Sequence, residues 1–312
     1  MAAHTDNTDR QPKIAVIGLG SMGIGMALSL RRAGLDVIGF DVSPASMDRF
    51  LREGGRCGQT PAEAAEGADI VVSVVVNAAQ TEAVLFGEDG VAAAMSPAGV
   101  FISSATMDPA IARKLAERLE KDARHYLDAP ISGGAARAGT GELTVMASGS
   151  STAFEKARPA LDAMASKVYE LGPTAGTGAA FKMINQLLAG VHIAAACEAI
   201  SLAAKQGLDL NMVYEVITAS AGNSWMFENR IPHVLSGDYS PLSAIEIFVK
   251  DLGIVQDMAR AERYPAPIAA AALQMYLAAA GAGMGRDDDA SLARVYAQLS
   301  GATLPAKHDG KP

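Results

Sequence analysis

A short apolar segment near the N-terminus, followed at once by three closely spaced glycines, constrains the fold of this chain more than any other feature. Residues 14–17 are apolar, and Gly18, Gly20 and Gly23 follow in the spacing G-x-G-x-x-G. Where a strand turns into a helix, the first glycine permits the tight turn and the third lets the helix pack closely on the strand. The segment therefore predicts the first strand, loop and helix of a doubly wound α/β sheet.

The rest of the first half repeats this alternation of apolar strands and helical segments. Further strands are expected over residues 37–40, 70–76 and 100–103, and one more runs into Asp128. Proline suits the first position of a helix, so the helices are expected to begin at Pro44, Pro61 and Pro109. The pattern is typical of strand-helix-strand units around a parallel sheet.

The glycine loop also predicts a cofactor site. The N–H groups at the start of its helix suit the phosphates of a dinucleotide, which assigns cofactor contacts to Gly18, Leu19, Gly20, Ser21, Met22 and Gly23. Asp41 ends the second strand, near the interval at which an acidic side chain meets the ribose hydroxyls. Its charge would repel a 2′-phosphate, so NAD is expected rather than NADP. The alternative for Asp41 is a helix cap before Pro44.

The second half of the chain is expected to be helical. After Tyr169, long segments rich in Ala, Leu and Met replace the β-branched runs. The predicted fold is an α/β Rossmann-type doubly wound sheet domain followed by an all-α helical domain. We expect a disordered extension over residues 1–12, an NAD-binding Rossmann domain over 13–172, a helical substrate and oligomerisation domain over 173–300, and a loose tail over 301–312.

Composition narrows the partners and the compartment. The formal net charge is -8 and no long basic run occurs, so nucleic acid is not expected as a partner. Cys57 and Cys197 do not have metal-ligand spacing, which predicts no metal site and a reducing, cytoplasmic compartment. Residues 187–204 and 268–282 are apolar, but we interpret them as buried helices of a soluble protein and expect no membrane association.

Two further motifs suggest where a substrate binds and reacts. Ser132, Gly133 and Gly134 follow the strand that ends at Asp128, and their backbone N–H groups and hydroxyl suit a carboxylate, although a plain turn is the alternative. Lys182 lies near the start of a long apolar helix, with Gln186 one turn further on. A partly desolvated lysine can take the hydroxyl proton when hydride leaves an alcohol carbon, although a surface position is the alternative.

Together these motifs resemble the β-hydroxyacid dehydrogenase family, which includes 3-hydroxyisobutyrate dehydrogenase and tartronate semialdehyde reductase. The resemblance runs from about Lys13 to about Arg294. It rests on four motifs: G-L-G-S-M-G at residues 18–23, D-A-P-I-S-G-G at 128–134, G-T-G-A-A-F-K at 176–182 and F-V-K-D-L at 248–252.

The resemblance assigns roles to individual residues. It implies that Lys182 is the general acid/base and that Ser132, Gly133 and Gly134 bind the substrate carboxylate. Phe248 and Lys250 would lie near the nicotinamide, although an ion pair on a solvated face is the alternative for Lys250. The remaining cofactor contacts that it implies are Val76, Asn77 and Thr106. It also implies a homodimer or homotetramer formed through the helical domain.

Two departures from the common family pattern are informative. Gln186 replaces the usual asparagine, and Ala105 replaces the usual serine, which puts the contribution of that position in doubt. Gln186, together with residues 75–80 and 221–230, resembles the L-threonate dehydrogenase branch, which oxidises C2 of a four-carbon sugar acid. Asn223 and Ser224 would suit a polyhydroxylated substrate, because buried hydroxyls need partners. The alternative for this pair is a loop that connects two helices.

These observations lead to one preferred function and two alternatives. We expect NAD-dependent oxidation of a small hydroxy acid, with L-threonate converted at C2 to the 2-oxo acid. Tartronate semialdehyde reductase or 3-hydroxyisobutyrate dehydrogenase activity on the same site is the alternative within enzymes. A catalytically inactive NAD-binding sensor is the alternative of another class, and the lysine retained beside a complete phosphate loop argues against it. NADH formation from candidate acids distinguishes the enzyme from the sensor.

Overall fold

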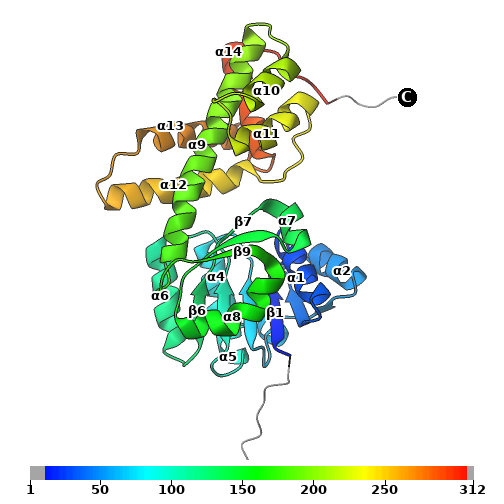
Figure 1. The fold of residues 1–312 in the computed structure, drawn as a ribbon, viewed down its shortest axis with the longest axis vertical. Coiled ribbons are helices and arrows are strands. Elements are labelled where there is room, and N and C mark those ends of the chain that lie inside the picture. Colours follow the sequence, from blue (N-terminus) through cyan, green and yellow to red (C-terminus); the bar gives the residue numbers. More distant parts are fainter. Residues whose placement is uncertain (1–10, 308–312) are drawn as a thin grey trace, which may run out of the picture. The chain divides into compact units, whose positions relative to one another are not determined.

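The computed structural model describes residues 11–307 and divides into two compact units between Lys182 and Met183 (Figure 1). The division falls inside the long helix α9 (Thr177–Lys205). The expected domain boundary at residue 172 lies just before this helix begins. Of the two expected terminal segments, 1–12 and 301–312, residues 1–10 and 308–312 lie outside the described part of the chain.

The first unit is built on a six-stranded sheet whose strands are all parallel. Its order is β3-β2-β1-β4-β5-β6, the arrangement of a doubly wound dinucleotide-binding fold, so the expected fold class is confirmed. The strands are β1 (Lys13–Ile17), β2 (Asp36–Phe40), β3 (Arg56–Cys57), β4 (Ile70–Ser73), β5 (Val100–Ser103) and β6 (His125–Asp128).

Helices follow the strands of this sheet in the expected rhythm. They are α1 (Gly23–Arg32), α2 (Pro44–Arg52), α3 (Pro61–Ala64), α4 (Ala78–Phe86), α5 (Val91–Ala94), α6 (Pro109–Glu120), α7 (Gly134–Thr140) and α8 (Ser151–Met164). The three prolines expected at helix starts open α2, α3 and α6. Each follows a side-chain cap, supplied by Ser43, Thr60 and Asp108.

The sheet is covered on both faces, and alternate residues of its strands belong to different cores. Ile14 and Val16 of β1 lie in one core, to which α1 and α8 contribute. Ala15 and Ile17 lie in the other, with side chains of α5 and α6. A strand buried on both faces reads as a continuous apolar run, which is why the sequence alone identified these strands.

A second, three-stranded sheet was not anticipated. Its strands are β7 (Ile131–Ser132), β8 (Leu143–Ala147) and β9 (Ala165–Glu170), in the order β7-β8-β9, with an antiparallel and then a parallel pairing. The first of these strands has only two residues, and the third is mostly exposed. Such strands lack the apolar run that marked the main sheet, so the sequence pattern did not reveal them.

Every regular element described after Met183 is helical, as expected. After α9 come α10 (Leu210–Thr218), α11 (Trp225–Ser236), α12 (Ile245–Ala261), α13 (Pro267–Ala279), η1 (Ala280–Met284), η2 (Asp289–Ser291) and α14 (Leu292–Ser300). They enclose a core of their own, in which Ile193, Cys197, Phe227 and Tyr276 are buried. The fold of this unit therefore rests on helix packing alone.

Two apolar helical segments differ in how they are buried. Thr177–Lys205 and Pro267–Met284 are both long and apolar enough to cross a membrane, a test that core helices of soluble proteins also pass. Half of the most apolar window is buried in the first segment, but only 28 % in the second. The expectation of a buried helix therefore fits the first segment and is wrong for the second, in which most of that window is not buried.

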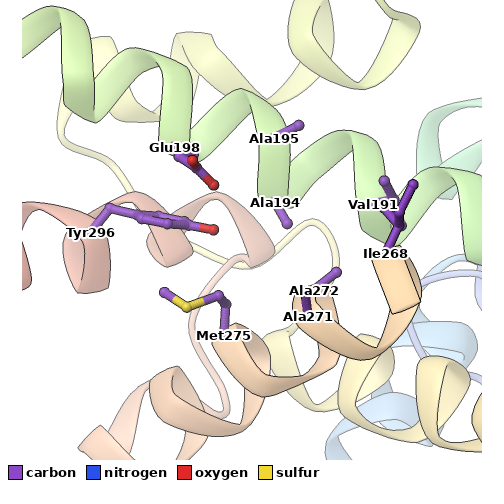
Figure 2. A pocket seen from close by; sticks show the side chains of 9 residues that line it. All are labelled: Val191, Ala194, Ala195, Glu198, Ile268, Ala271, Ala272, Met275 and Tyr296. Atoms are coloured by element: carbon purple, nitrogen blue, oxygen red, sulfur yellow. The ribbon is translucent and has the colours of Figure 1, made fainter. Parts of the chain in front are cut away.

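A pocket of about 400 Å³ lies between α9, α13 and α14 (Figure 2). Its lining is mainly aliphatic, with Glu198 and Tyr296 as its polar members. None of the site residues expected from the sequence lines it, so this pocket is not the candidate catalytic site.

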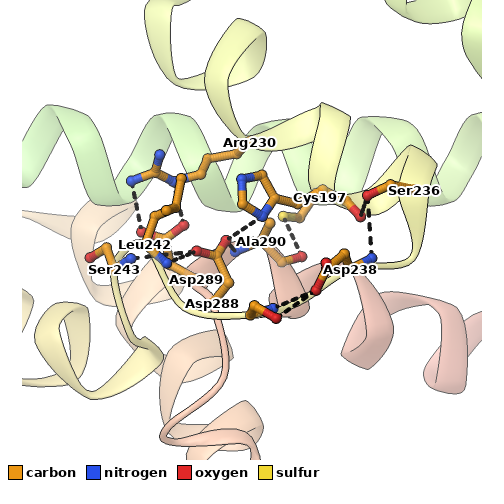
Figure 3. Close-up of polar contacts among 11 residues, drawn as sticks. Cys197, Arg230, Ser236, Asp238, Leu242, Ser243, Asp288, Asp289 and Ala290 are labelled. Carbon is orange, nitrogen blue, oxygen red and sulfur yellow. Dashed lines mark hydrogen bonds and ion pairs between the residues drawn. The ribbon is translucent and has the colours of Figure 1, made fainter. Parts of the chain in front are cut away.

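A buried ion pair links α11 to η2 (Figure 3). Arg230 donates from Nε to Asp289 Oδ1 at 2.6 Å, and Asp289 is fully buried. Its neighbour Asp288, also fully buried, accepts a hydrogen bond from the N–H of Leu242 at 2.8 Å. Arg230 ends the segment 221–230 that resembled the L-threonate branch, and its contacts here are structural.

Candidate functional site

The glycine loop has the backbone that its spacing predicted. Gly18 has a φ of +98°, and a Cβ there would lie 2.5 Å from the carbonyl oxygen of Val74. A Cβ on Gly23 would collide with the carbonyl oxygen of Gly18. A Cβ on Gly20, in contrast, would meet nothing, so this position faces open space. The loop therefore leaves room for a ligand at Gly20, directly before the N-terminus of α1.

Asp41 lies against this loop. Its Oδ2 accepts a hydrogen bond from the N–H of Leu19 at 2.6 Å, and its Oδ1 accepts one from the N–H of Ser43 at 2.8 Å. The cap of α2 is Ser43, whose hydroxyl accepts from the N–H of Ser46. The alternative interpretation of Asp41 as the helix cap is therefore wrong, and its negative charge lies beside the loop that would hold a dinucleotide.

The three remaining cofactor candidates of this unit follow neighbouring strands. Val76 and Asn77 come after β4 and Thr106 after β5, so they share the carboxyl edge of the sheet with the glycine loop. Asn77 caps α4 by accepting from the N–H of Gln80, while Val76 is half exposed. Ala105 is buried in the apolar core, so the residue that departs from the family pattern packs inward.

The turn after β7 has a backbone that only glycine adopts readily. Gly133 and Gly134 have φ values of +137° and +74°, and they lead from Ser132 into α7. Successive residues in this region of backbone space can turn their N–H groups toward one anion. A side chain at either position would be strained, so the two glycines are required by the backbone itself.

Lys182 is buried close to this turn. Only 8 % of it is exposed, and its Nζ donates a hydrogen bond to the carbonyl oxygen of Ile131 at 2.8 Å. The alternative of a surface lysine at a helix start is therefore wrong. The contact brings the ammonium group beside β7, the strand that ends at Ser132.

A buried carboxylate at the end of β6 was missed by the sequence analysis. Asp128 is 1 % exposed, and its Oδ2 accepts hydrogen bonds from the N–H groups of Gly176 and Ala179, both at 2.8 Å. Burial raises the pKa of Asp128 to about 6, although these two N–H groups and the hydroxyl of Ser148 favour the charged form. The available signal was the position of Asp128, an acidic residue at the end of a strand. It opens the motif at residues 128–134, in which only the serine and the two glycines were given a role.

A second buried carboxylate, in the helical unit, holds two of the expected site residues. Gln186 donates from Nε2 to Asp251 Oδ2 at 2.6 Å, and Lys250 Nζ lies 2.5 Å from Asp251 Oδ1. Asn185 donates to Gln186 Oε1 at 2.9 Å, which fixes the orientation of the amide. The ion pair considered as an alternative for Lys250 is present, but Asp251 is buried rather than solvated. Asp251 is part of the motif at residues 248–252, but no role was predicted for it from the sequence.

The other candidates of the helical unit make mainly structural contacts. Phe248 is buried and its ring stacks on that of Tyr276, with centroids 5.3 Å apart. Ser224 caps α11 by accepting from the N–H of Phe227. Asn223 donates to the carbonyl oxygen of Thr218 at 3.2 Å. This matches the connecting loop considered as the alternative for Asn223 and Ser224.

Comparison with known proteins identifies the family. Residues 13–172 match the model for the NAD-binding domain of 6-phosphogluconate dehydrogenase. Residues 176–296 match the NAD-binding model of NADP-dependent 3-hydroxyisobutyrate dehydrogenase. An L-threonate dehydrogenase from Cupriavidus necator is 53 % identical over 94 % of this chain and 98 % of its own length. The chain belongs to the 3-hydroxyisobutyrate dehydrogenase-like family of β-hydroxyacid dehydrogenases.

Two more relatives in this dehydrogenase family are similar over nearly their whole length. The L-threonate dehydrogenase of Escherichia coli K12 is 49 % identical over 94 % of this chain and 96 % of its own. A crystal structure of 3-hydroxyisobutyrate dehydrogenase from Salmonella typhimurium, 49 % identical, superposes with a TM-score of 0.87 and covers 91 % of this chain and all of that one. The expected family and fold are confirmed.

Family membership makes this protein an NAD-binding hydroxyacid dehydrogenase, and the first unit fits that cofactor. Gly20 leaves the approach to the N-terminus of α1 open, as a pyrophosphate requires. Asp41 puts a carboxylate at the end of β2, as the ribose hydroxyls require. The expected enzyme class and cofactor are therefore confirmed, while the roles of the individual site residues stay predictions.

Proposed function

We propose that this protein is an NAD-dependent dehydrogenase that oxidises L-threonate at C2 to the 2-oxo acid. The relatives named L-threonate dehydrogenase support this substrate, since they are about half identical over nearly the full chain. The observation that carries the chemistry is the buried Lys182, whose Nζ donates to Ile131 O at 2.8 Å beside the turn of Ser132.

In this proposal the substrate carboxylate is held by the turn after β7. The hydroxyl of Ser132 and the N–H groups of Gly133 and Gly134 are its donors. Lys182 accepts the proton of the C2 hydroxyl through Nζ, so that the carbon-oxygen double bond forms as the C2 hydrogen leaves with both electrons. When bound, NAD would be held by the glycine loop, Asp41, Val76, Asn77 and Thr106, and it would supply the acceptor for that hydride.

The helical unit would orient the polar groups of the substrate. The amide of Gln186 is fixed by its hydrogen bonds with Asn185 and Asp251. We propose that Gln186 orients the substrate hydroxyl without transferring a proton. Asp251 would hold both Gln186 and Lys250 in place, and Lys250 and Phe248 would lie near the nicotinamide.

We expect L-threonate to give the highest kcat/KM among small hydroxy acids. Initial rates of NADH formation would be compared for L-threonate, D-threonate, both erythronates, 3-hydroxyisobutyrate and glycerate. The crystal structure from Salmonella typhimurium bears the name 3-hydroxyisobutyrate dehydrogenase, so that acid is the alternative substrate. A higher kcat/KM for 3-hydroxyisobutyrate would overturn the threonate assignment, and NAD binding without turnover of any acid would favour the sensor.

We expect NAD to support turnover at least about tenfold better than NADP, because a 2′-phosphate would meet the charge of Asp41. Asp41→Asn combined with Val42→Arg is expected to reduce this preference, since it removes the negative charge and adds a positive one. Val42 is 90 % exposed, so the arginine can reach solvent without disturbing the core. Equal kcat/KM values for the two cofactors in the unaltered protein would contradict the role of Asp41.

We also propose a cytoplasmic homo-oligomer, a dimer or tetramer, formed through the helical unit. The support is apolar surface that this chain does not cover itself. Most of the Pro267–Met284 window is not buried, and the pocket beside α13 is lined mainly by aliphatic side chains (Figure 2). The exposed large apolar residues of α9, α13 and α14 are Phe181, Ile184, Leu188, Leu202, Ile268, Leu277 and Leu299. A second copy would present the same surface to the first. Light scattering during size-exclusion chromatography measures the mass directly.

A further inference from the structure

The buried carboxylate of Asp128 has no part in the chemistry proposed above, yet it lies at the start of the helix that carries the lysine. The first N–H groups of a helix have no acceptor within the helix. Asp128 Oδ2 accepts two of them, from Gly176 and Ala179, each at 2.8 Å. The acceptor thus comes from a strand that is distant in the sequence, rather than from the residue before the helix.

Ser148, the residue directly after β8, completes this arrangement. Its hydroxyl oxygen accepts from the N–H of Gly178 at 2.9 Å and donates to Asp128 Oδ2 at 3.3 Å. The backbones of Asp128 and Ser148 also pair, with N–H to O distances of 3.0 and 2.8 Å. A Cβ on Gly178 would lie 3.0 Å from the carbonyl oxygen of Asp128, so the first turn of α9 is pressed against the sheet. The position of this turn is therefore closely determined.

The same short stretch of chain also holds the side chain of the lysine. Lys182 comes one turn after Ala179, and its Nζ donates to the carbonyl oxygen of Ile131. Ile131 lies three residues after Asp128 in the sequence and directly precedes Ser132 in β7. Within residues 128–131, Asp128 therefore holds the backbone that precedes Lys182, and Ile131 holds its ammonium group.

Burying the carboxylate of Asp128 costs desolvation free energy that capping a helix does not require. Other helices of this chain are capped by residues next to them, such as Ser150 at α8 and the exposed Asp209 at α10. Asp128 is almost fully buried instead, and burial raises its pKa to about 6. A local cap would satisfy the same N–H groups with less desolvation. What the local cap would not supply is a link between α9 and the strand that leads to Ser132.

We propose that Asp128 is a positioning residue for the dehydrogenase reaction, which holds the first turn of α9 on β6 and thereby places Lys182 Nζ relative to the turn at Ser132. This inference rests on the proposed role of Lys182. Loss of the contact would let the start of α9 shift, and a misplacement of about 1 Å can lower a rate by about a hundredfold.

The first test compares three variants. Asp128→Ala is expected to lower kcat by about ten- to a hundredfold, with the NAD dissociation constant changed by less than about threefold, because the glycine loop is intact. Asp128→Asn is expected to recover most of kcat, since the amide oxygen can still accept from Gly176 and Ala179. The control Asp209→Ala removes an exposed helix cap in the other unit and should leave kcat unchanged.

The second test asks whether Asp128 acts through Lys182. In a Lys182→Ala background, Asp128→Ala should lower kcat by less than about twofold, while its effect on Tm remains. An equal loss of kcat in both backgrounds, or unchanged kcat in the single variant, would overturn the proposal. If Asp128→Ala does not fold, Ser148→Ala takes its place and should show the same dependence on the background. Unaltered kcat in Lys182→Ala alone would refute the proposed function instead.

Discussion

Lys182→Ala is expected to lower kcat by about two to four orders of magnitude, the range for loss of a general acid/base. The NAD dissociation constant should stay within about threefold, because the cofactor contacts proposed for the first unit are independent of this side chain. Lys182 is buried, and its Nζ is held by Ile131 O, so no solvent group can take its place readily. Stopped-flow measurement of NADH formation with L-threonate, together with NAD titration, tests both statements.

Two further variants sharpen this experiment. Lys182→Arg keeps the positive charge but cannot release a proton, so it should be nearly as inactive as the alanine variant. Lys114→Ala removes an exposed lysine of α6 and should leave kcat unchanged. Turnover close to the unaltered level in Lys182→Ala would refute the mechanism.

The second and third glycines of the loop, Gly20 and Gly23, are expected to respond differently to an added methyl group. Gly23→Ala should lower the free energy of unfolding by about 1–3 kcal/mol, because its Cβ would collide with the backbone of Gly18. Gly20→Ala should change it by less than about 0.5 kcal/mol, because its Cβ meets nothing. The Gly20 variant should instead bind NAD at least about tenfold more weakly, a loss of about 1.4 kcal/mol, because the methyl group occupies the approach of the pyrophosphate.

Denaturant unfolding without cofactor and NAD titration separate these two effects. The matched control is Gly67→Ala, which lies on the surface away from the loop, with no atom near its Cβ but a positive φ. It should cost some stability and leave NAD affinity unchanged. If Gly20→Ala bound NAD as tightly as the unaltered protein, the pyrophosphate would not approach at this position.

The parts of the fold that the sequence predicted well are those set by neighbouring residues. The glycine loop, the buried strands of the main sheet and the proline-led helices are each marked by a pattern of residues that lie close together in the sequence. The roles of Asp128 and Asp251 depend on partners 48 and 65 residues away, Gly176 and Gln186. Contacts between residues so far apart leave no periodic pattern in the sequence. The two aspartates could therefore be seen in their motifs, but their hydrogen-bond partners could not be predicted.

The second sheet was missed for the same reason. β8 alternates buried and partly exposed residues, but β7 has only two residues and β9 is mainly exposed. These strands are stabilised by pairing with segments that follow the helices α7 and α8 rather than by an apolar run of their own. Lys182 was identified through its motif, whereas its contact with Ile131 required the position of β7.

The two hydrogen bonds of Asp41 restrict how the cofactor preference of such an enzyme can evolve. The Asp41 carboxylate would repel a 2′-phosphate, and it also accepts a hydrogen bond from the N–H of Leu19 in the glycine loop. A substitution that removes the whole side chain would admit the phosphate but release the loop, and both cofactors would then bind poorly. Asparagine is the neutral replacement that keeps an oxygen for Leu19. A lineage moving from NAD to NADP is therefore expected to pass through asparagine at this position, before any arginine is gained nearby.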